Sequence, residues 1–305
     1  MKAIVNKAHV EGVVYEHKLQ AKVTGENSKN PGTEYITGEL RVLTDPETNN
    51  IVPVHFTYLT ATTKAGKENA TYTVLKKIID GVLPTQLGGG NTMVKIDGEV
   101  GVNDFYTERD GQTELVSAKR IEGKFVHAVT DVDKDVSKRN YIEADMVISG
   151  MRTLDATENY PARTFVKGAV FGPYRKDFLP VEFEVENPNA ISYFEGLDAS
   201  SKNPVFTKVY VRVLSQTVTK QKREESAFGD DIVTETTRET KKWIIYNAQK
   251  DIYAWDDEST ITAAELTKAL ADRETYLATI KAGYEERKAA KGATAAPAAA
   301  GGFNF

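Results

Sequence analysis

The sequence predicts a mainly β protein built from two similar units, each with five strands and one helix. Three observations support this fold class. Short segments rich in β-branched and aromatic residues follow one another to about residue 255. Two segments with helical spacing interrupt them, one in each half of the chain. The length of 305 residues is sufficient for two domains of ordinary size.

The first unit opens with three expected strands, near residues 12–24, 34–44 and 51–60. A helix is expected over residues 69–81, because apolar residues recur there at helical spacing and Gly81 stands at a C-cap position. Two more strands, 93–106 and 114–128, are joined by a turn at Asp110 and Gly111. Three strands, a helix and two strands form the order of an OB-type five-stranded barrel.

The second unit repeats this order. Residues 51–56 (IVPVHF) are echoed by 178–183 (FLPVEF), and 94–100 (VKIDGEV) by 207–213 (TKVYVRV). These matches favour a diverged duplication, and a chance alignment of two β-rich stretches is the alternative. The last two strands, expected near 205–221 and 232–248, are long enough to project from the barrel as a β-ribbon.

The expected domains are an OB-type barrel over residues 1–130, a linker over 131–142 and a second barrel with its ribbon over 143–256. A helix over 260–290 is predicted from the capping box of Thr262 and Glu265. Its apolar stripe could dock on a barrel or pair with another chain. Docking is expected, because the stripe covers fewer than three heptads and Arg273 interrupts it. The Ala/Gly/Pro-rich tail over 291–305 is expected to be disordered.

The composition argues against an enzyme, a metal site or a bound cofactor. The chain has no cysteine, and its four histidines do not stand at metal-ligand spacings. It has no Gly-x-Ser-x-Gly elbow, and the loop at 87–91 (LGGGN) lacks the Lys-Ser/Thr of a phosphate-binding loop. The chain shows neither a signal peptide nor a long apolar run, so a cytoplasmic protein is expected.

The segment 205–213 (VFTKVYVRV) carries the strongest signal for binding. Its valines and Thr207 fall on one face of the expected strand, which reads as core, and Phe206, Lys208, Tyr210 and Arg212 fall on the other. Alternating aromatic and basic side chains are typical of a platform for single-stranded nucleic acid, on which bases stack and cations meet phosphates. The alternative is that Phe206 and Tyr210 cover a small second core under the C-terminal helix.

Other candidates for the same role are distributed over both units. The net charge of -5 speaks weakly against coating duplex DNA by charge alone, but it permits a local basic surface for single strands. Phe56 and Tyr58 lie in phase with Val52 and Val54 and are expected in the core. The further nucleic-acid-binding candidates are Lys18, Lys22, Tyr35, Arg41, Phe105, Tyr106, Tyr174, Arg175 and Lys176.

Several phrases of the first unit resemble a known family. They are 11–15 (EGVVY), 35–42 (YITGELRV), 71–79 (TYTVLKKII), 102–107 (VNDFYT) and 115–120 (LVSAKR). Over residues 10–130 the chain is similar to OB-type single-stranded DNA-binding proteins of tailed phages and mobile elements of Gram-positive bacteria. The resemblance implies binding of single-stranded DNA during replication or recombination in a host cytoplasm. It supplies no contact residues.

The tail has a second, looser resemblance. Bacterial single-strand-binding proteins end in a disordered linker and an acidic tip that finishes in Pro-Phe and docks partner proteins. Phe303 and Phe305 match the aromatic end but not the acidic residues, so they are candidates for contacting replication or recombination proteins. The alternative function for the whole chain is a structural or adaptor protein whose barrels bind protein. The sequence does not predict an oligomeric state.

Overall fold

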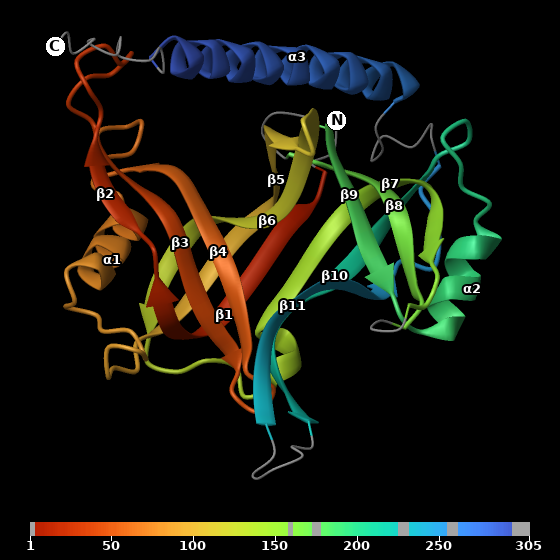
Figure 1. Cartoon of the computed structure of the whole chain (residues 1–305), viewed down its shortest axis with the longest axis horizontal. Coiled ribbons are helices and arrows are strands. Elements are labelled where there is room, and N and C mark those ends of the chain that lie inside the picture. The colour runs from red at the N-terminus through yellow and green to blue at the C-terminus, as the bar shows by residue number, and fades with distance from the viewer. Residues whose placement is uncertain (1–3, 158–160, 173–177, 225–231, 255–261, 295–305) are drawn as a thin grey trace, which may run out of the picture.

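The computed structural model describes residues 4–157, 161–172, 178–224, 232–254 and 262–294. Within these residues, eleven strands join in one sheet, and three α-helices and one 3₁₀ helix accompany them (Figure 1). The strands are β1 (Asn6–His17), β2 (Gln20–Val23), β3 (Glu34–Asp45), β4 (Asn50–Thr60), β5 (Met93–Arg109), β6 (Gln112–Val129), β7 (Asn140–Leu154), β8 (Arg163–Phe171), β9 (Phe178–Val185), β10 (Val205–Glu224) and β11 (Ile232–Ala248). The helices are α1 (Ala70–Ile79), η1 (Val136–Lys138), α2 (Pro188–Gly196) and α3 (Ala263–Thr294).

The strand pairings close into two circuits of five strands. The N-terminal circuit runs β1–β3–β4–β6–β5 and back to β1, and the C-terminal circuit runs β7–β8–β9–β11–β10 and back to β7. In each circuit the third and fifth strands pair in parallel, and the other neighbours are antiparallel. Helices α1 and α2 stand between the third and fourth strands. The predictions of a mainly β chain and of these two helix positions are confirmed.

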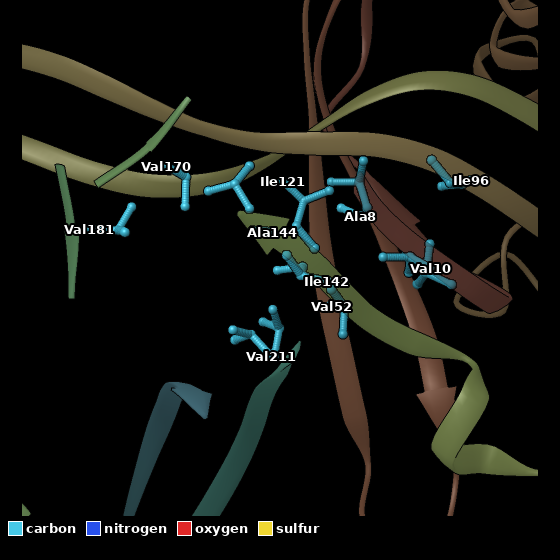
Figure 2. Packing of buried hydrophobic residues seen from close by; sticks show 14 of the residues in the cluster. Ala8, Val10, Val52, Ile96, Ile121, Ile142, Ala144, Val170, Val181 and Val211 are labelled. Atoms are coloured by element: carbon cyan, nitrogen blue, oxygen red, sulfur yellow. The ribbon is translucent and has the colours of Figure 1, made fainter. Parts of the chain in front are cut away.

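The two circuits share hydrogen bonds and one core. One side of β1 pairs with β5, while its other side pairs with β7 through residues 6–10 and with β3 through residues 13–17. A single cluster of buried side chains extends from β1 and β4 to β8, β9 and β10, as Figure 2 shows for Val10, Val52, Val170, Val181 and Val211. Residues 140–142 of the expected linker already belong to β7, and the division into domains stays a prediction.

Buried asparagine side chains also join the circuits. Asn50 at the start of β4 donates to the carbonyl oxygen of Val213 in β10 at 3.2 Å and accepts from the backbone nitrogen of Ser215 at 2.7 Å. Asn6 in β1 donates to the carbonyl oxygen of Phe171 in β8 at 3.1 Å. Buried amides need such partners, because an unsatisfied polar group in the core costs about 1–3 kcal/mol. These bonds fix the relative position of the two circuits.

The expected strand over residues 12–24 is wrong as a single element. It begins earlier, at Asn6, and breaks between His17 and Gln20 into β1 and β2. At the break the backbone passes close to Gly38, where an added Cβ atom would lie 2.2 Å from the carbonyl oxygen of Lys18. Gly38 has a φ of +125°, which favours glycine. The close approach of the two backbones turns β2 along β3.

Helix α1 forms as its sequence predicts. The Asn69 side chain caps it by accepting from the backbone nitrogen of Thr71, and Gly81 follows its end with a φ of +74°. Leu75 and Ile78 enter the shared core. Helix α2 is capped in the same way by Asn187.

Helix α3 lies across the end of both circuits (Figure 1). The predicted capping box is confirmed, because Thr262 and Glu265 exchange side-chain to backbone hydrogen bonds. Near its start Ala269 and Leu266 pack on a small second core. Farther along, three alternate residues of β5 meet the helix: Asp104 contacts Arg273, Tyr106 contacts Tyr284 and Glu108 contacts Lys288. Helix α3 therefore docks on the strand circuits, as expected.

Lys119 of β6 sits at the contact between the circuits. Its ammonium donates to the carbonyl oxygen of Glu182 in β9 and lies 5.8 Å from the centroid of the Phe183 ring. Burial is the main reason that the pKa of Lys119 falls to about 8. The positive charge of Arg163 also lowers this pKa, whereas the negative charge of Glu182 raises it. A lysine with this pKa costs stability while it is charged in the folded protein.

We expect replacement of Lys119 by methionine to change how stability depends on pH. The pKa of Lys119 is lower when folded than when unfolded, so the unfolded chain binds more protons between about pH 8 and 10.5. The stability of the wild type relative to Lys119→Met should therefore rise through this window by up to roughly 3 kcal/mol. Urea unfolding of both proteins from pH 7 to 11 measures the difference, and a flat difference would contradict the prediction.

Among the described residues, no helix has the length and apolar character that crossing a membrane requires.

Candidate nucleic-acid interface

The inward face of the β10 segment matches its prediction, but one outward residue does not. Val205, Thr207, Val209, Val211 and Val213 are all buried. The prediction for Phe206 is wrong: its ring is 0% exposed and lies 5.2 Å from the Tyr253 ring, in the small core beneath α3. Helix α3 covers this end of the strand, so the outward position is apolar and closed. Phe206 therefore cannot stack on a base.

The next outward residues of β10 lie at an open surface beside Tyr246 of β11. The Arg212 guanidinium stacks over the Tyr246 ring, 4.5 Å from its centroid, and the Tyr210 ring lies 6.3 Å from the same ring. Cation–π contact of this kind holds an arginine in place without using its hydrogen-bond donors. The arrangement keeps a ring and a cation together at the surface.

A β-bulge places Tyr246 there. Tyr210 pairs with Asn247 and Val211 pairs with Ile245, so Tyr246 is an extra residue in β11. The Ile245 side chain is buried, whereas Tyr246 is 45% exposed. Bulges re-aim side chains in this way and are frequent beside functional sites. Burial also raises the pKa of Tyr246, which stays neutral at physiological pH.

The Arg212 guanidinium is available to a ligand. Its Nε atom is buried without a hydrogen-bond partner, and the described residues supply no hydrogen bond or ion pair to the guanidinium. Lys208, four residues earlier, is instead bonded to Glu143 of β7 at 2.7 Å, and this bond raises the pKa of Lys208. Arg212 contributes to the lowered pKa of Asp135, after the hydrogen bonds from Ser137. A phosphate is the kind of anion that a stacked, unpaired arginine binds.

Two further rings extend this surface across the sheet. His9 of β1 and Tyr141 of β7 are directly opposite in register and stack with centroids 5.2 Å apart. Tyr141 lies near enough to Tyr246 to raise its pKa slightly. We call Tyr246, Tyr210, Tyr141 and His9 the aromatic row. Because the row crosses β11, β10, β7 and β1, both circuits contribute to it.

The sequence alone did not indicate three members of the row. Tyr141 lay in the expected linker, although its alternation with Ile142 and Ala144 is a strand signal that could have identified it. His9 preceded the expected first strand. Tyr246 depends on a bulge, which simple alternation along a strand does not reveal.

Most of the candidates in the N-terminal circuit lie near the start of β3. Tyr35 and Tyr58 stack with centroids 4.6 Å apart, and Lys22 of β2 is opposite Tyr35 in register. Tyr58 is 49% exposed, so its expected place in the core is wrong, whereas Phe56 is buried as expected. Lys18 is exposed as well. Where the structure is described, no ring contact or hydrogen bond links the Tyr35–Tyr58 pair to the aromatic row.

Two of the remaining candidates, Arg41 and Tyr106, already have partners within the protein. Arg41 is already paired with Glu39 at 2.7 Å and with Glu16 at 3.1 Å. Tyr106 faces Tyr284 of α3, while Phe105 on the opposite face is 40% exposed. Tyr174, Arg175, Lys176, Phe303 and Phe305 lie outside the described residues.

The described part of the chain contains no cluster of three or more metal-ligating side chains. Fold and surface together define a predominantly β protein whose two strand circuits share a row of partly exposed rings beside Arg212, which makes no hydrogen bond or ion pair with the described residues. The model of the YorF family matches residues 5–283, and the chain therefore belongs to the YorF family.

No curated protein matches the sequence. Among solved structures, the chain is similar to a deletion mutant of the single-stranded DNA-binding protein from Thermus aquaticus, with 10% identity and a TM-score of 0.44 over 85% of this chain and 100% of that one. The wild-type Thermus aquaticus protein is similar with 8% identity and a TM-score of 0.44, over 83% and 96% of the two chains. Likeness at this level assigns no activity to the chain.

Proposed function

We propose that this protein binds single-stranded DNA, with little sequence preference, on the aromatic row. The observation that carries the proposal is Arg212, a cation held on the Tyr246 ring whose guanidinium has no hydrogen bond or ion pair among the described residues. Exposed rings stack on any base, at about 1–3 kcal/mol per base, and an arginine beside them meets the phosphates. Tyr210 and Lys208 belong to the same contact surface.

Each strand circuit is proposed to be an OB-type barrel. A closed set of five strands with a helix between the third and fourth supports this assignment. OB-type barrels commonly bind with their second and third strands. In the N-terminal circuit Tyr35 lies on the second strand, β3, with Lys22 of the adjoining β2 opposite it and Lys18 just before β2. These residues form a second proposed contact area, with Phe105 farther away. The aromatic row uses the first, fourth and fifth strands instead.

The biological setting follows from the resemblance of residues 10–130 and belongs to the proposal. The protein would protect or present single strands during phage-type replication or recombination in a host cytoplasm. Phe303 and Phe305 would contact proteins of the same process. Deletion of residues 301–305 is then expected to weaken such a contact and to leave DNA affinity unchanged, and unchanged partner binding would refute the role of the tail.

The function is tested by fluorescence anisotropy with a labelled single-stranded oligonucleotide of about 30 nucleotides, at low and high salt. Binding is expected to weaken as salt rises, because phosphate contacts release counterions. A duplex of the same sequence is the control and should bind far less. If neither form binds at micromolar protein, the proposal fails, and a protein-binding adaptor becomes the better description.

A further inference from the structure

The aromatic row does not end at His9. Asp97 of β5 is directly opposite His9, and Phe125 of β6 is directly opposite Asp97. Residues directly opposite each other in antiparallel strands point to the same face of the sheet. The 2.8 Å bond between His9 Nδ1 and Asp97 Oδ1 agrees with this placement. Phe125 therefore lies on the same surface as His9 and Tyr141.

Phe125 is the most exposed ring of this surface. Its side chain is 59% exposed, more than the 45% of Tyr246 at the opposite end. An exposed apolar side chain contributes little to the stability of the folded protein. Five rings aligned on one surface therefore indicate a binding partner that covers them. The ends of this extended row lie on β11 of one circuit and β6 of the other.

We infer that a bound single strand crosses the β-strands from Tyr246 to Phe125 and so occupies both circuits at once. This inference rests on the proposed function and specifies the path of the DNA. Six strands take part, and their separation of about 4.8 Å gives a path of about 24 Å. At about 3.4 Å per stacked nucleotide the full path accommodates about seven nucleotides. The part from Tyr246 to His9 alone accommodates about four.

The charges along the path place the bases toward the protein. Asp97 stands between His9 and Phe125 and its side chain is 61% exposed. Its carboxylate would repel a phosphate lying over it. We therefore place the bases of the DNA against the rings and its sugar–phosphate backbone along the edge of the row. Lys7, exposed and two residues before His9 on the same face of β1, lies at that edge. Lys7 and Arg212 are the cations that the phosphates would meet.

The path is tested by the dependence of affinity on oligonucleotide length. Single strands of 4, 6, 8, 10 and 12 nucleotides are titrated with the full-length protein, with Phe125→Ala and with Tyr276→Ala. Tyr276 is a ring of α3 with 51% exposure and serves as the matched control. For the wild type, affinity should rise steeply up to about seven nucleotides. Phe125→Ala should lose about tenfold in affinity for strands of eight or more and little for strands of four.

Two results would overturn the inference and are distinguishable. If long strands bind but Phe125→Ala behaves as Tyr276→Ala does at every length, the DNA does not reach β6, while the proposed function stands. In that case Tyr58→Ala reveals whether the strand turns onto β3 and β4 instead. If no strand of any length binds the wild-type protein, the proposed function fails and the path fails with it.

Discussion

Replacing Arg212 and Tyr246 together with alanine is expected to weaken binding of a single-stranded oligonucleotide by about 3 to 5 kcal/mol, which is a hundredfold to several thousandfold in Kd. Loss of a charged hydrogen bond accounts for about 1.5–3 kcal/mol and loss of a stacked base for about 1–3 kcal/mol. Anisotropy at constant salt measures the change. The slope of affinity against salt should also become less steep, because one phosphate contact is lost.

The matched control is the double variant Arg287→Ala and Tyr276→Ala on α3, which removes the same charge and the same ring from an exposed surface. It should bind as the wild type does. Both residues of the test variant are exposed or partly exposed, so the fold should survive, and the melting temperature verifies this. Equal losses in the two double variants would mean that charge alone governs binding and that the aromatic row is not the site.

Replacing Arg273 with alanine is expected to destabilise the protein by about 3 to 5 kcal/mol. Its guanidinium donates to Asp104 at 2.8 and 3.1 Å, and the Asp104 side chain is only 1% exposed. Without Arg273, that carboxylate remains buried with Ser117 as its remaining side-chain donor. A buried charge without its partner is among the most costly defects in a protein. Urea unfolding measures the loss of stability.

The same helix and strand provide the control. Lys288 contacts Glu108 at 3.0 Å, but both side chains are about half exposed. Lys288→Ala should therefore cost far less stability than Arg273→Ala. The double variant Asp104→Ala and Arg273→Ala should lose less than Arg273→Ala alone, because no unpaired charge is left. If Arg273→Ala unfolds as readily as Lys288→Ala, the ion pair does not hold α3 in place.

The sequence predicts those parts of the fold that depend on neighbouring residues. The valines of β10 alternate with aromatic and basic side chains, and the valines are buried as that pattern predicts. Asn69, Gly81 and the Thr262–Glu265 pair predict helix ends because capping involves only a few adjacent residues. Local chemistry decides these features, so they can be found without knowledge of the rest of the chain.

The binding surface depends instead on contacts between distant segments. Phe206 and Tyr210 occupy equivalent outward positions of one strand, and the docking of α3 and of Tyr253 separates a buried ring from a partly exposed one. Tyr141 meets His9 through pairing of β7 with β1, and Tyr246 reaches the row through a bulge. No sequence pattern within a single strand predicts these contacts between strands. The chemistry of the site was therefore predictable at Tyr210 and Arg212, and its extent was not.

The split pairing of β1 has a consequence during synthesis on the ribosome. Residues 6–10 of β1 have no partner on one side until β7, which begins at Asn140, has emerged. At about 5–20 residues per second, the nascent N-terminal half displays that open strand edge for a time on the order of seconds. Open edges recruit strands from other chains. We expect an isolated fragment of residues 1–130 to aggregate, because the second half of the chain is needed to cover the open edge of β1.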